Sequence, residues 1–170
     1  MVKVLRIEVA DEAGTQAVAA ELARVVSSGL VTLQGPLGAG KTSLCRAWLR
    51  ALGHSGSVRS PTYTLVEPYF EDAAVPVFHL DLYRLGDAEE LEYLGVRDYL
   101  AGASLCLVEW PERGQDVLPS ADLSIEIVPT EVGRRLVLRA GGARTERQLE
   151  QLAVRLRPHF KVCETEGGRG

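Results

Sequence analysis

Short apolar runs alternate along the chain with longer stretches in which apolar residues recur every three or four positions. The short runs predict strands at residues 4–9, 30–34, 63–70, 75–81, 104–109, 123–128 and 135–139. The periodic stretches predict helices over residues 42–52, 87–94 and 96–100, one carrying Val18, Leu22, Val25 and Val26, and one after Thr145. Strands that alternate with helices indicate an α/β fold with a mostly parallel central sheet flanked by helices and with late antiparallel strands.

Capping residues mark where the first and last helices begin. Asp11 or Thr15 can cap the first helix, and Thr145 with Gln148 predicts a capping box that opens the last one. Beyond that helix the chain becomes polar and glycine-rich. We therefore expect one domain over residues 1–157 and a disordered tail over residues 158–170.

A glycine-rich segment joins the second predicted strand to the helix that follows it. It matches GxxxxGK[ST], the Walker A phosphate-binding loop, with Gly35, Pro36, Leu37, Gly38, Ala39, Gly40, Lys41 and Thr42, followed by Ser43. Glycines let such a loop turn its N–H groups toward phosphate oxygens, and the helix dipole adds positive potential. Lys41 would reach the β- and γ-phosphates and Thr42 would ligate Mg²⁺. The expected fold is thus a single P-loop NTPase-type domain.

Two apolar runs end in a carboxylate, Asp81 after 75–80 and Glu109 after 105–108. Because the carboxyl ends of parallel strands meet at the ligand crevice, both residues are candidates. Either can hold Mg²⁺ while the other orients or deprotonates the attacking water, and the sequence does not assign the two roles. His79, two residues before Asp81, is expected to be packed or hydrogen-bonded rather than catalytic.

A hydroxyl-rich segment with Ser60, Thr62 and Thr64 lies between the helix after the glycine-rich loop and the next strand. In P-loop switches a loop at this place senses the γ-phosphate through a hydroxyl, and Thr62 or Thr64 can do so here. An ordinary proline turn is the alternative. Trp110 follows Glu109 directly and either covers the nucleotide, forms part of a docking surface or, as we favour, caps the core at a turn.

Charge and composition narrow the function. The formal net charge is −4 and the basic residues are scattered, so autonomous nucleic-acid binding is not expected. The chain contains no asparagine and no Thr-Lys pair, so it lacks the [NT]KxD loop that reads guanine, which favours ATP over GTP. No apolar stretch approaches the roughly 18 residues of a bilayer span, and no signal-peptide region is evident. We expect a cytoplasmic protein with no membrane partner.

The three cysteines lie far apart, and no CxxC or Cys/His cluster is present. The spacing therefore predicts neither a zinc site nor a disulfide framework. Cys45 and Cys106 are expected in the core, and Cys163 is expected to be a free thiol.

Four segments in this order resemble the TsaE (YjeE) family of bacterial tRNA modification ATPases: residues 35–42, 60–69, 79–85 and 107–114. The resemblance implies binding of ATP and Mg²⁺, weak hydrolysis alone, and action with the partners TsaB and TsaD. These partners transfer threonylcarbamoyl to the adenosine beside the anticodon, so that tRNA is reached through them. The ATPase step is thought to reset that complex between rounds.

The resemblance also implies roles for individual residues. Thr42 and Glu109 would hold magnesium, Asp81 would support hydrolysis, and Ser60–Thr64 would be the nucleotide-sensing switch. Asp11, Thr15 and Arg134 would approach the adenine.

Two other functions fit the residues. A small-molecule P-loop kinase also combines GxxxxGK[ST] with a short α/β chain and usually carries an arginine-bearing lid over an acceptor pocket. Arg84, Arg97 and Arg113 are candidates for such a lid, but no lid-like insertion is evident in the sequence. A nucleotide-switched adaptor would bind ATP to order the Ser60–Thr64 segment without requiring hydrolysis.

Overall fold

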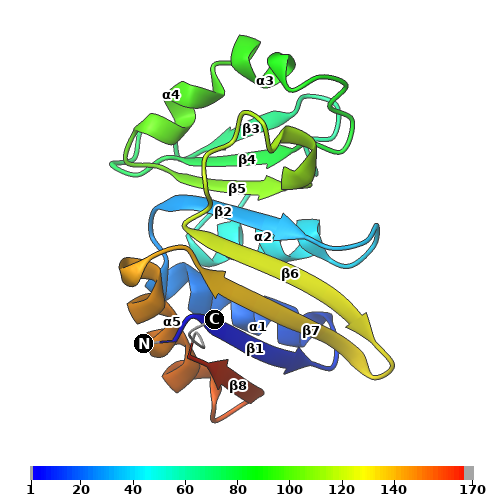
Figure 1. Ribbon diagram of the computed structural model, residues 1–170, viewed down its shortest axis with the longest axis vertical. Helices are drawn as coiled ribbons and strands as arrows, with labels where there is room; N and C mark the ends of the chain where they lie inside the picture. The colour runs from blue at the N-terminus through cyan, green and yellow to red at the C-terminus, as the bar shows by residue number, and fades with distance from the viewer. Residues whose placement is uncertain (1, 167–170) are drawn as a thin grey trace.

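The computed structural model describes residues 2–166 as one eight-stranded mixed sheet with helices on its faces (Figure 1). The strands are β1 (Val4–Val9), β2 (Gly29–Gln34), β3 (Val66–Tyr69), β4 (Val77–Asp81), β5 (Leu105–Glu109), β6 (Leu123–Thr130), β7 (Gly133–Ala140) and β8 (Lys161–Thr165). The helices are α1 (Glu12–Val25), α2 (Lys41–Ala51), α3 (Glu89–Tyr93), α4 (Val96–Ala101), the 3₁₀ turn η1 (Pro111–Gly114) and α5 (Ala143–Leu156). The strand order is β3-β4-β5-β2-β6-β7-β1-β8.

The expectation of a mostly parallel sheet is wrong, whereas the late antiparallel strands are confirmed. Among the described strands, parallel pairing is confined to the neighbours β4, β5, β2 and β6. β6 and β7 are joined by a turn of two residues, which permits only antiparallel pairing. β7 then pairs antiparallel with β1, and β3 pairs antiparallel with β4 across another hairpin.

The tail expected to be disordered from residue 158 contains a strand instead. β8 pairs antiparallel with β1 over five residues, from Val4↔Thr165 to Glu8↔Lys161. The edge of β1 supplies backbone partners that a polar sequence does not reveal, because strand pairing depends on a neighbour distant in the chain. Residues 167–170 lie outside the described part of the chain.

The two predicted caps have different outcomes. Asp11 caps α1, and its carboxylate accepts a hydrogen bond of 2.8 Å from the Gly14 N–H. The capping box at Thr145 is wrong, because α5 begins two residues earlier with Gly142 as its N-cap. Thr145 is buried in the first turn of α5.

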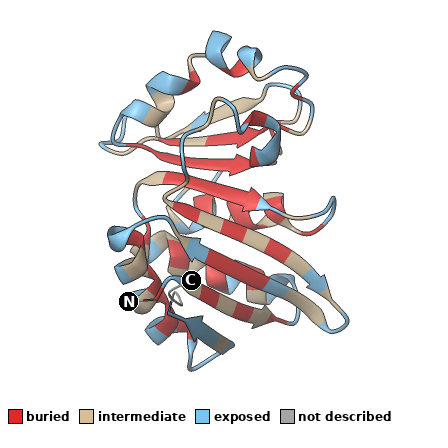
Figure 2. Ribbon diagram, in the orientation of Figure 1, coloured by how far each residue is buried: buried red, intermediate tan, exposed pale blue. Residues whose placement is uncertain are grey.

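Two apolar clusters lie on opposite faces of the sheet. The helices α1, α2 and α5 pack on one face, behind the sheet in Figure 1, whereas α3 and α4 contribute Leu91 and Val96 to the cluster on the other face. Figure 2 shows that burial is most continuous along the central strands. The central strands β2 and β5 contribute alternate residues to both clusters, so they are buried almost throughout. The carboxyl ends of β2, β4 and β5 meet at one edge of the sheet. Within residues 2–166 no helix has both the length and the apolar character to cross a bilayer.

Candidate functional site

The segment Gly35–Thr42, here the Gly35–Thr42 loop, turns sharply between β2 and α2. Gly35, Gly38 and Gly40 have φ values of +152°, +78° and +110°, which L side chains rarely adopt. A Cβ on Gly35 would also lie 2.7 Å from the Ile127 carbonyl oxygen, so this position has no room for a side chain. The loop ends at the N-terminus of α2, where free backbone N–H groups and the helix dipole favour an anion.

Lys41 lies at the centre of the site with 5% of its surface exposed. Its Nζ donates hydrogen bonds to the carbonyl oxygens of Gly35 (2.6 Å) and Pro36 (3.0 Å). The ammonium also lies over the Trp110 ring, 4.0 Å from its centroid. Burial lowers the pKa of Lys41 from its ordinary value, although the negative charges of Glu109 and other nearby carboxylates oppose this shift.

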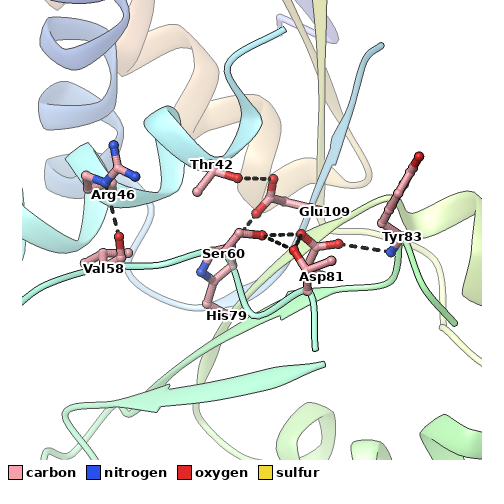
Figure 3. Close-up of polar contacts among 9 residues, drawn as sticks. Thr42, Arg46, Val58, Ser60, His79, Asp81, Tyr83 and Glu109 are labelled. Carbon is pink, nitrogen blue, oxygen red and sulfur yellow. Dashed lines mark hydrogen bonds and ion pairs between the residues drawn. The ribbon is translucent and has the colours of Figure 1, made fainter. Parts of the chain in front are cut away.

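Glu109 is bonded through both of its carboxylate oxygens (Figure 3). Thr42 Oγ1, from the first turn of α2, donates to Oε1 at 2.8 Å. His79 Nε2, from β4, lies 2.7 Å from Oε2, and both His79 and Glu109 are almost completely buried. The prediction of a packed, hydrogen-bonded His79 is confirmed, and its partner is one of the two candidate carboxylates.

Asp81 lies directly opposite Glu109 in the β4–β5 register. Its Oδ2 accepts hydrogen bonds from Ser60 Oγ and, at 3.3 Å, from Thr62 Oγ1, and its Oδ1 accepts one of 3.0 Å from the Tyr83 N–H (Figure 3). The predicted hydroxyl-rich segment is thus bonded to the predicted strand-end carboxylate. Thr64 points elsewhere, because its hydroxyl is exposed and bonds to Glu67 at 3.2 Å.

These groups surround a cavity of about 410 Å³. It is lined by Leu37, Gly38, Gly40, Lys41, Thr42, Ser43, Ser60, Thr62, Asp81, Tyr83, Arg84, Glu109, Trp110 and Arg134. Residues from five separate parts of the chain therefore meet where the parallel strands end.

An adjoining cavity of about 390 Å³ shares Gly38, Ser43 and Arg134 with the first and is also lined by Asp11. Two of the three residues expected near the adenine, Asp11 and Arg134, therefore lie close to the Gly35–Thr42 loop. Thr15 lines neither cavity, because it is fully buried in α1.

Sequence reasoning considered Trp110, Arg84 and Arg113 but missed Tyr83, which lines the cavity and lies among them. The rings of Tyr83 and Trp110 lie 4.9 Å apart, and the Arg113 guanidinium lies 5.3 Å from the Tyr83 centroid. Arg84 lies 4.5 Å over the exposed ring of Tyr63 and donates to its hydroxyl at 3.3 Å. The available signal was the position of Tyr83 two residues after the candidate carboxylate Asp81.

Trp110 is the N-cap of η1 at the end of β5, where it packs against the second apolar cluster as favoured from the sequence, and it also lines the cavity. Its backbone is left-handed, with φ 58° and ψ 49°, which is uncommon for a bulky residue. The conformation directs the ring across Lys41, where it covers the ammonium.

The oxygen donors at the cavity fit a hard divalent cation. Thr42 and Glu109 are already 2.8 Å apart, and the second carboxylate, Asp81, lines the same cavity. Hydroxyl and carboxylate oxygens are the ligands that Mg²⁺ prefers. The residues therefore suit a magnesium ion bound together with a phosphate group at the Gly35–Thr42 loop.

Comparison with known proteins adds independent information. The family model "Threonylcarbamoyl adenosine biosynthesis protein TsaE" matches residues 9–137. The chain is 55% identical over 98 residues to tRNA threonylcarbamoyladenosine biosynthesis protein TsaE of Haemophilus influenzae, covering 58% of this chain and 61% of that protein. It is 37% identical over 141 residues to the protein of the same name from Bacillus subtilis, covering 82% and 87%.

A solved structure is similar over nearly the whole chain. The crystal structure of Bacillus subtilis YdiB has a TM-score of 0.75 and 33% sequence identity, and the match covers 91% of this chain and 97% of that one. The matched family segment contains the Gly35–Thr42 loop, both strand-end carboxylates and the Ser60–Thr64 segment. The chain therefore belongs to the TsaE family.

Proposed function

We propose that this protein binds ATP with Mg²⁺ and hydrolyses it as the nucleotide-driven subunit of tRNA threonylcarbamoyladenosine biosynthesis, together with TsaB and TsaD. Relatives from several bacteria are named for that biosynthesis. The observation that carries the chemical part is the convergence of Lys41, Thr42, Asp81 and Glu109 on one cavity beside the Gly35–Thr42 loop.

The loop and Lys41 hold the phosphates in this proposal. Backbone N–H groups at the start of α2 readily donate hydrogen bonds to an anion, because they have no partners within the helix. The Lys41 ammonium is poorly hydrated and is bonded to two neutral carbonyls. A phosphate oxygen is a stronger partner for a buried cation than a carbonyl is, so nucleotide binding would draw Lys41 toward the phosphates.

Thr42 and Glu109 would hold Mg²⁺, and the bound ion would neutralise phosphate charge. His79 keeps Glu109 in place through its 2.7 Å contact. Asp81 is the proposed group that orients the attacking water and accepts its proton. Asp81 is held by three donors, so it is positioned before the nucleotide arrives.

The hydroxyls of Ser60 and Thr62 link the proposed water-activating residue Asp81 to the partly exposed segment Ser60–Thr64. They bond to Asp81 and lie 3.0 Å from each other, while the neighbouring Tyr63 ring is exposed. A γ-phosphate that competes for either hydroxyl would shift the whole segment, which makes it the proposed nucleotide-sensing switch.

For the adenine, we propose the adjoining cavity, where the Arg134 guanidinium can stack on a purine.

The partner proteins would supply the tRNA-binding surface. A net charge of −4 with scattered basic residues provides no electrostatic footprint for RNA on this chain. The proposed role is therefore to drive the cycle of the TsaB–TsaD complex in the cytoplasm, with tRNA contacted through that complex.

Calorimetry with purified protein and turnover assays test this proposal. Lys41→Ala is expected to weaken Mg-ATP binding at least tenfold, because a charge-assisted phosphate contact is worth roughly 1.5–3 kcal/mol. Asp81→Asn is expected to bind Mg-ATP within about threefold of the wild type and to lose at least a hundredfold in turnover. Turnover is expected to rise when TsaB and TsaD are added.

A matched pair of threonines controls for indirect effects. Thr62→Ala removes a hydroxyl bonded to Asp81 and should lower partner-stimulated turnover, whereas Thr64→Ala removes an exposed hydroxyl and should not. Absence of Mg-ATP binding to the folded protein at millimolar concentrations would contradict the nucleotide proposal. Turnover that TsaB and TsaD leave unchanged would contradict the partner role alone.

A further inference from the structure

Three metal-ligating side chains of different chemistry meet behind the cavity. Cys45 from α2, His79 from β4 and Glu109 from β5 each place one ligand atom within 4.8 Å of the other two. All three are buried, with Cys45 and His79 completely so. The second ring nitrogen of His79, Nδ1, has no hydrogen-bond partner among the described residues. A buried polar nitrogen without a partner is uncommon in folded proteins and requires an explanation.

The dimensions of this cluster suit a tetrahedral ion. Zinc holds sulfur, nitrogen and oxygen ligands at about 2.0–2.3 Å, which sets neighbouring ligand atoms roughly 3.5 Å apart. His79 and Glu109 are already in contact at 2.7 Å. Side-chain adjustments of about 1 Å therefore bring the three ligands into range of one ion. Three protein ligands with one open position is a known arrangement for zinc, and Glu109 lines the cavity through which the fourth ligand can enter.

We propose that Cys45, His79 and Glu109 form a site for a zinc-like divalent ion, distinct in ligand chemistry from the magnesium site but sharing Glu109 with it. Binding displaces the Cys45 thiol proton to solvent and leaves a thiolate on the metal, and no electrons are transferred. Thiolate and imidazole ligands select zinc-like ions, whereas Mg²⁺ keeps to oxygen donors.

Local charge favours a cation at this place. The carboxylates of Glu109 and Asp81 place negative charge close to the Cys45 thiol. The same negative charges attract a divalent ion, and coordination offsets the cost of ionising the thiol.

Occupation of this site would inhibit the chain, a consequence that rests on the proposed function. One oxygen of Glu109 serves Thr42 and the other serves His79. A zinc-like ion that draws the carboxylate toward Cys45 and His79 takes it away from Thr42, so the magnesium site loses a ligand. The cluster would therefore make nucleotide turnover sensitive to zinc even when magnesium is in large excess.

Co²⁺ is the probe for the site itself, because it occupies zinc sites and absorbs strongly in the near ultraviolet when bound to a thiolate. All variants carry Cys163→Ser, since Cys163 is exposed and can bind metal on its own. Without nucleotide, Cys163→Ser protein is expected to bind one Co²⁺ per chain with a thiolate band. Adding Cys45→Ser should abolish the band, and adding Cys106→Ser should preserve it. Cys106 is the matched control because it is a buried thiol bonded to the Tyr99 carbonyl oxygen, away from His79.

Turnover provides the second readout. One equivalent of Zn²⁺ in excess Mg²⁺ is expected to lower ATP hydrolysis at least tenfold in the Cys163→Ser protein and less than twofold when Cys45→Ser is added. If Cys45→Ser does not fold, both measurements are made on Cys45→Ala instead. A missing thiolate band in Cys163→Ser protein, or a band that persists without Cys45, would overturn the proposal. The cobalt measurement uses no nucleotide, so failure of the metal site and failure of ATP binding are separately visible.

Discussion

At the scale of single residues, the site depends on buried charges that are each fixed by specific neighbours. Glu109 has 1% of its surface exposed and has a hydrogen-bonding neighbour at each oxygen. Asp81 is 4% exposed and accepts from three groups. Buried carboxylates are stable only when such partners are present. The partners of these two residues are therefore as informative about the site as the carboxylates themselves.

Replacing His79 tests this dependence. His79→Ala leaves one oxygen of a buried carboxylate without its partner and opens a space between β4 and α2, so we expect the free energy of unfolding to fall by about 2–4 kcal/mol. Urea denaturation measures the change. His159→Ala, at an exposed histidine, should change stability by less than about 0.5 kcal/mol. Equal effects of the two substitutions would show that the contact between His79 and Glu109 contributes nothing.

The buried ammonium of Lys41 predicts a pH dependence of stability. Burial lowers the pKa of Lys41 in the folded protein below its ordinary value of 10.5. Between the lowered pKa and 10.5 the unfolded chain binds more protons at Lys41 than the folded chain does. The contribution of Lys41 to the free energy of unfolding therefore rises with pH in this range. The free energy of unfolding of the wild type minus that of Lys41→Met should therefore increase as pH approaches 10.5. Denaturant titrations from pH 8 to 10.5 measure it, and a flat or falling difference would contradict the prediction.

At the scale of elements, the Gly35–Thr42 loop is shaped by glycines in different surroundings. Gly35 has a positive φ and faces the Ile127 carbonyl oxygen, whereas a Cβ on Gly38 would meet nothing within 4 Å. β6 therefore lies close behind the start of the loop and fixes its path. The tip at Gly38 is open to the two cavities that it lines.

Two alanine substitutions separate these surroundings. Gly35→Ala adds a clash with a backbone carbonyl to the cost of a positive φ, and we expect a loss of at least about 2 kcal/mol in the free energy of unfolding. Gly38→Ala carries only the conformational cost of about 1 kcal/mol. Thermal or urea unfolding of both variants tests the order. A larger loss at Gly38 than at Gly35 would be inconsistent with the described path of the loop.

Elements also show what the sequence could predict. The loop, Asp81 and Glu109 were predictable because each is marked by its own local pattern at a strand end. The pairing of β8 with β1 and the mixed sheet were not, since partners distant in the chain decide them. The contact between His79 and Glu109 depends on the β4–β5 register, and Thr64 faces away from the site because the chain turns before β3.

At the scale of the whole molecule, one sheet joins two apolar clusters. Adjacent residues of β5, such as Leu107 and Val108, face the two clusters in turn, so neither cluster can lose β5 without disrupting the other. Trp48 belongs to the first cluster, and Trp110 packs against the second. The two tryptophans thus report on opposite faces of the sheet.

We therefore expect a single cooperative unfolding transition. In each of two single-tryptophan variants, Trp48→Phe and Trp110→Phe, the fluorescence curve should coincide with the circular dichroism curve of the same variant. If the fluorescence midpoint of either variant differs from its circular dichroism midpoint, the two faces of the sheet unfold independently.

The pairing of β1 with β8 has a practical consequence for work with this protein. Val4 and Thr165 are direct neighbours in the β1–β8 pair. They lie at the ends of these strands that are far from the cavities, and Val4 is roughly 17 Å along β1 from the end that adjoins the second cavity. A fluorescent domain or surface anchor attached at either of these two strand ends would lie on the side of the molecule away from the cavities. Tethered in that way, the protein would keep its cavity mouth unobstructed for whatever enters it.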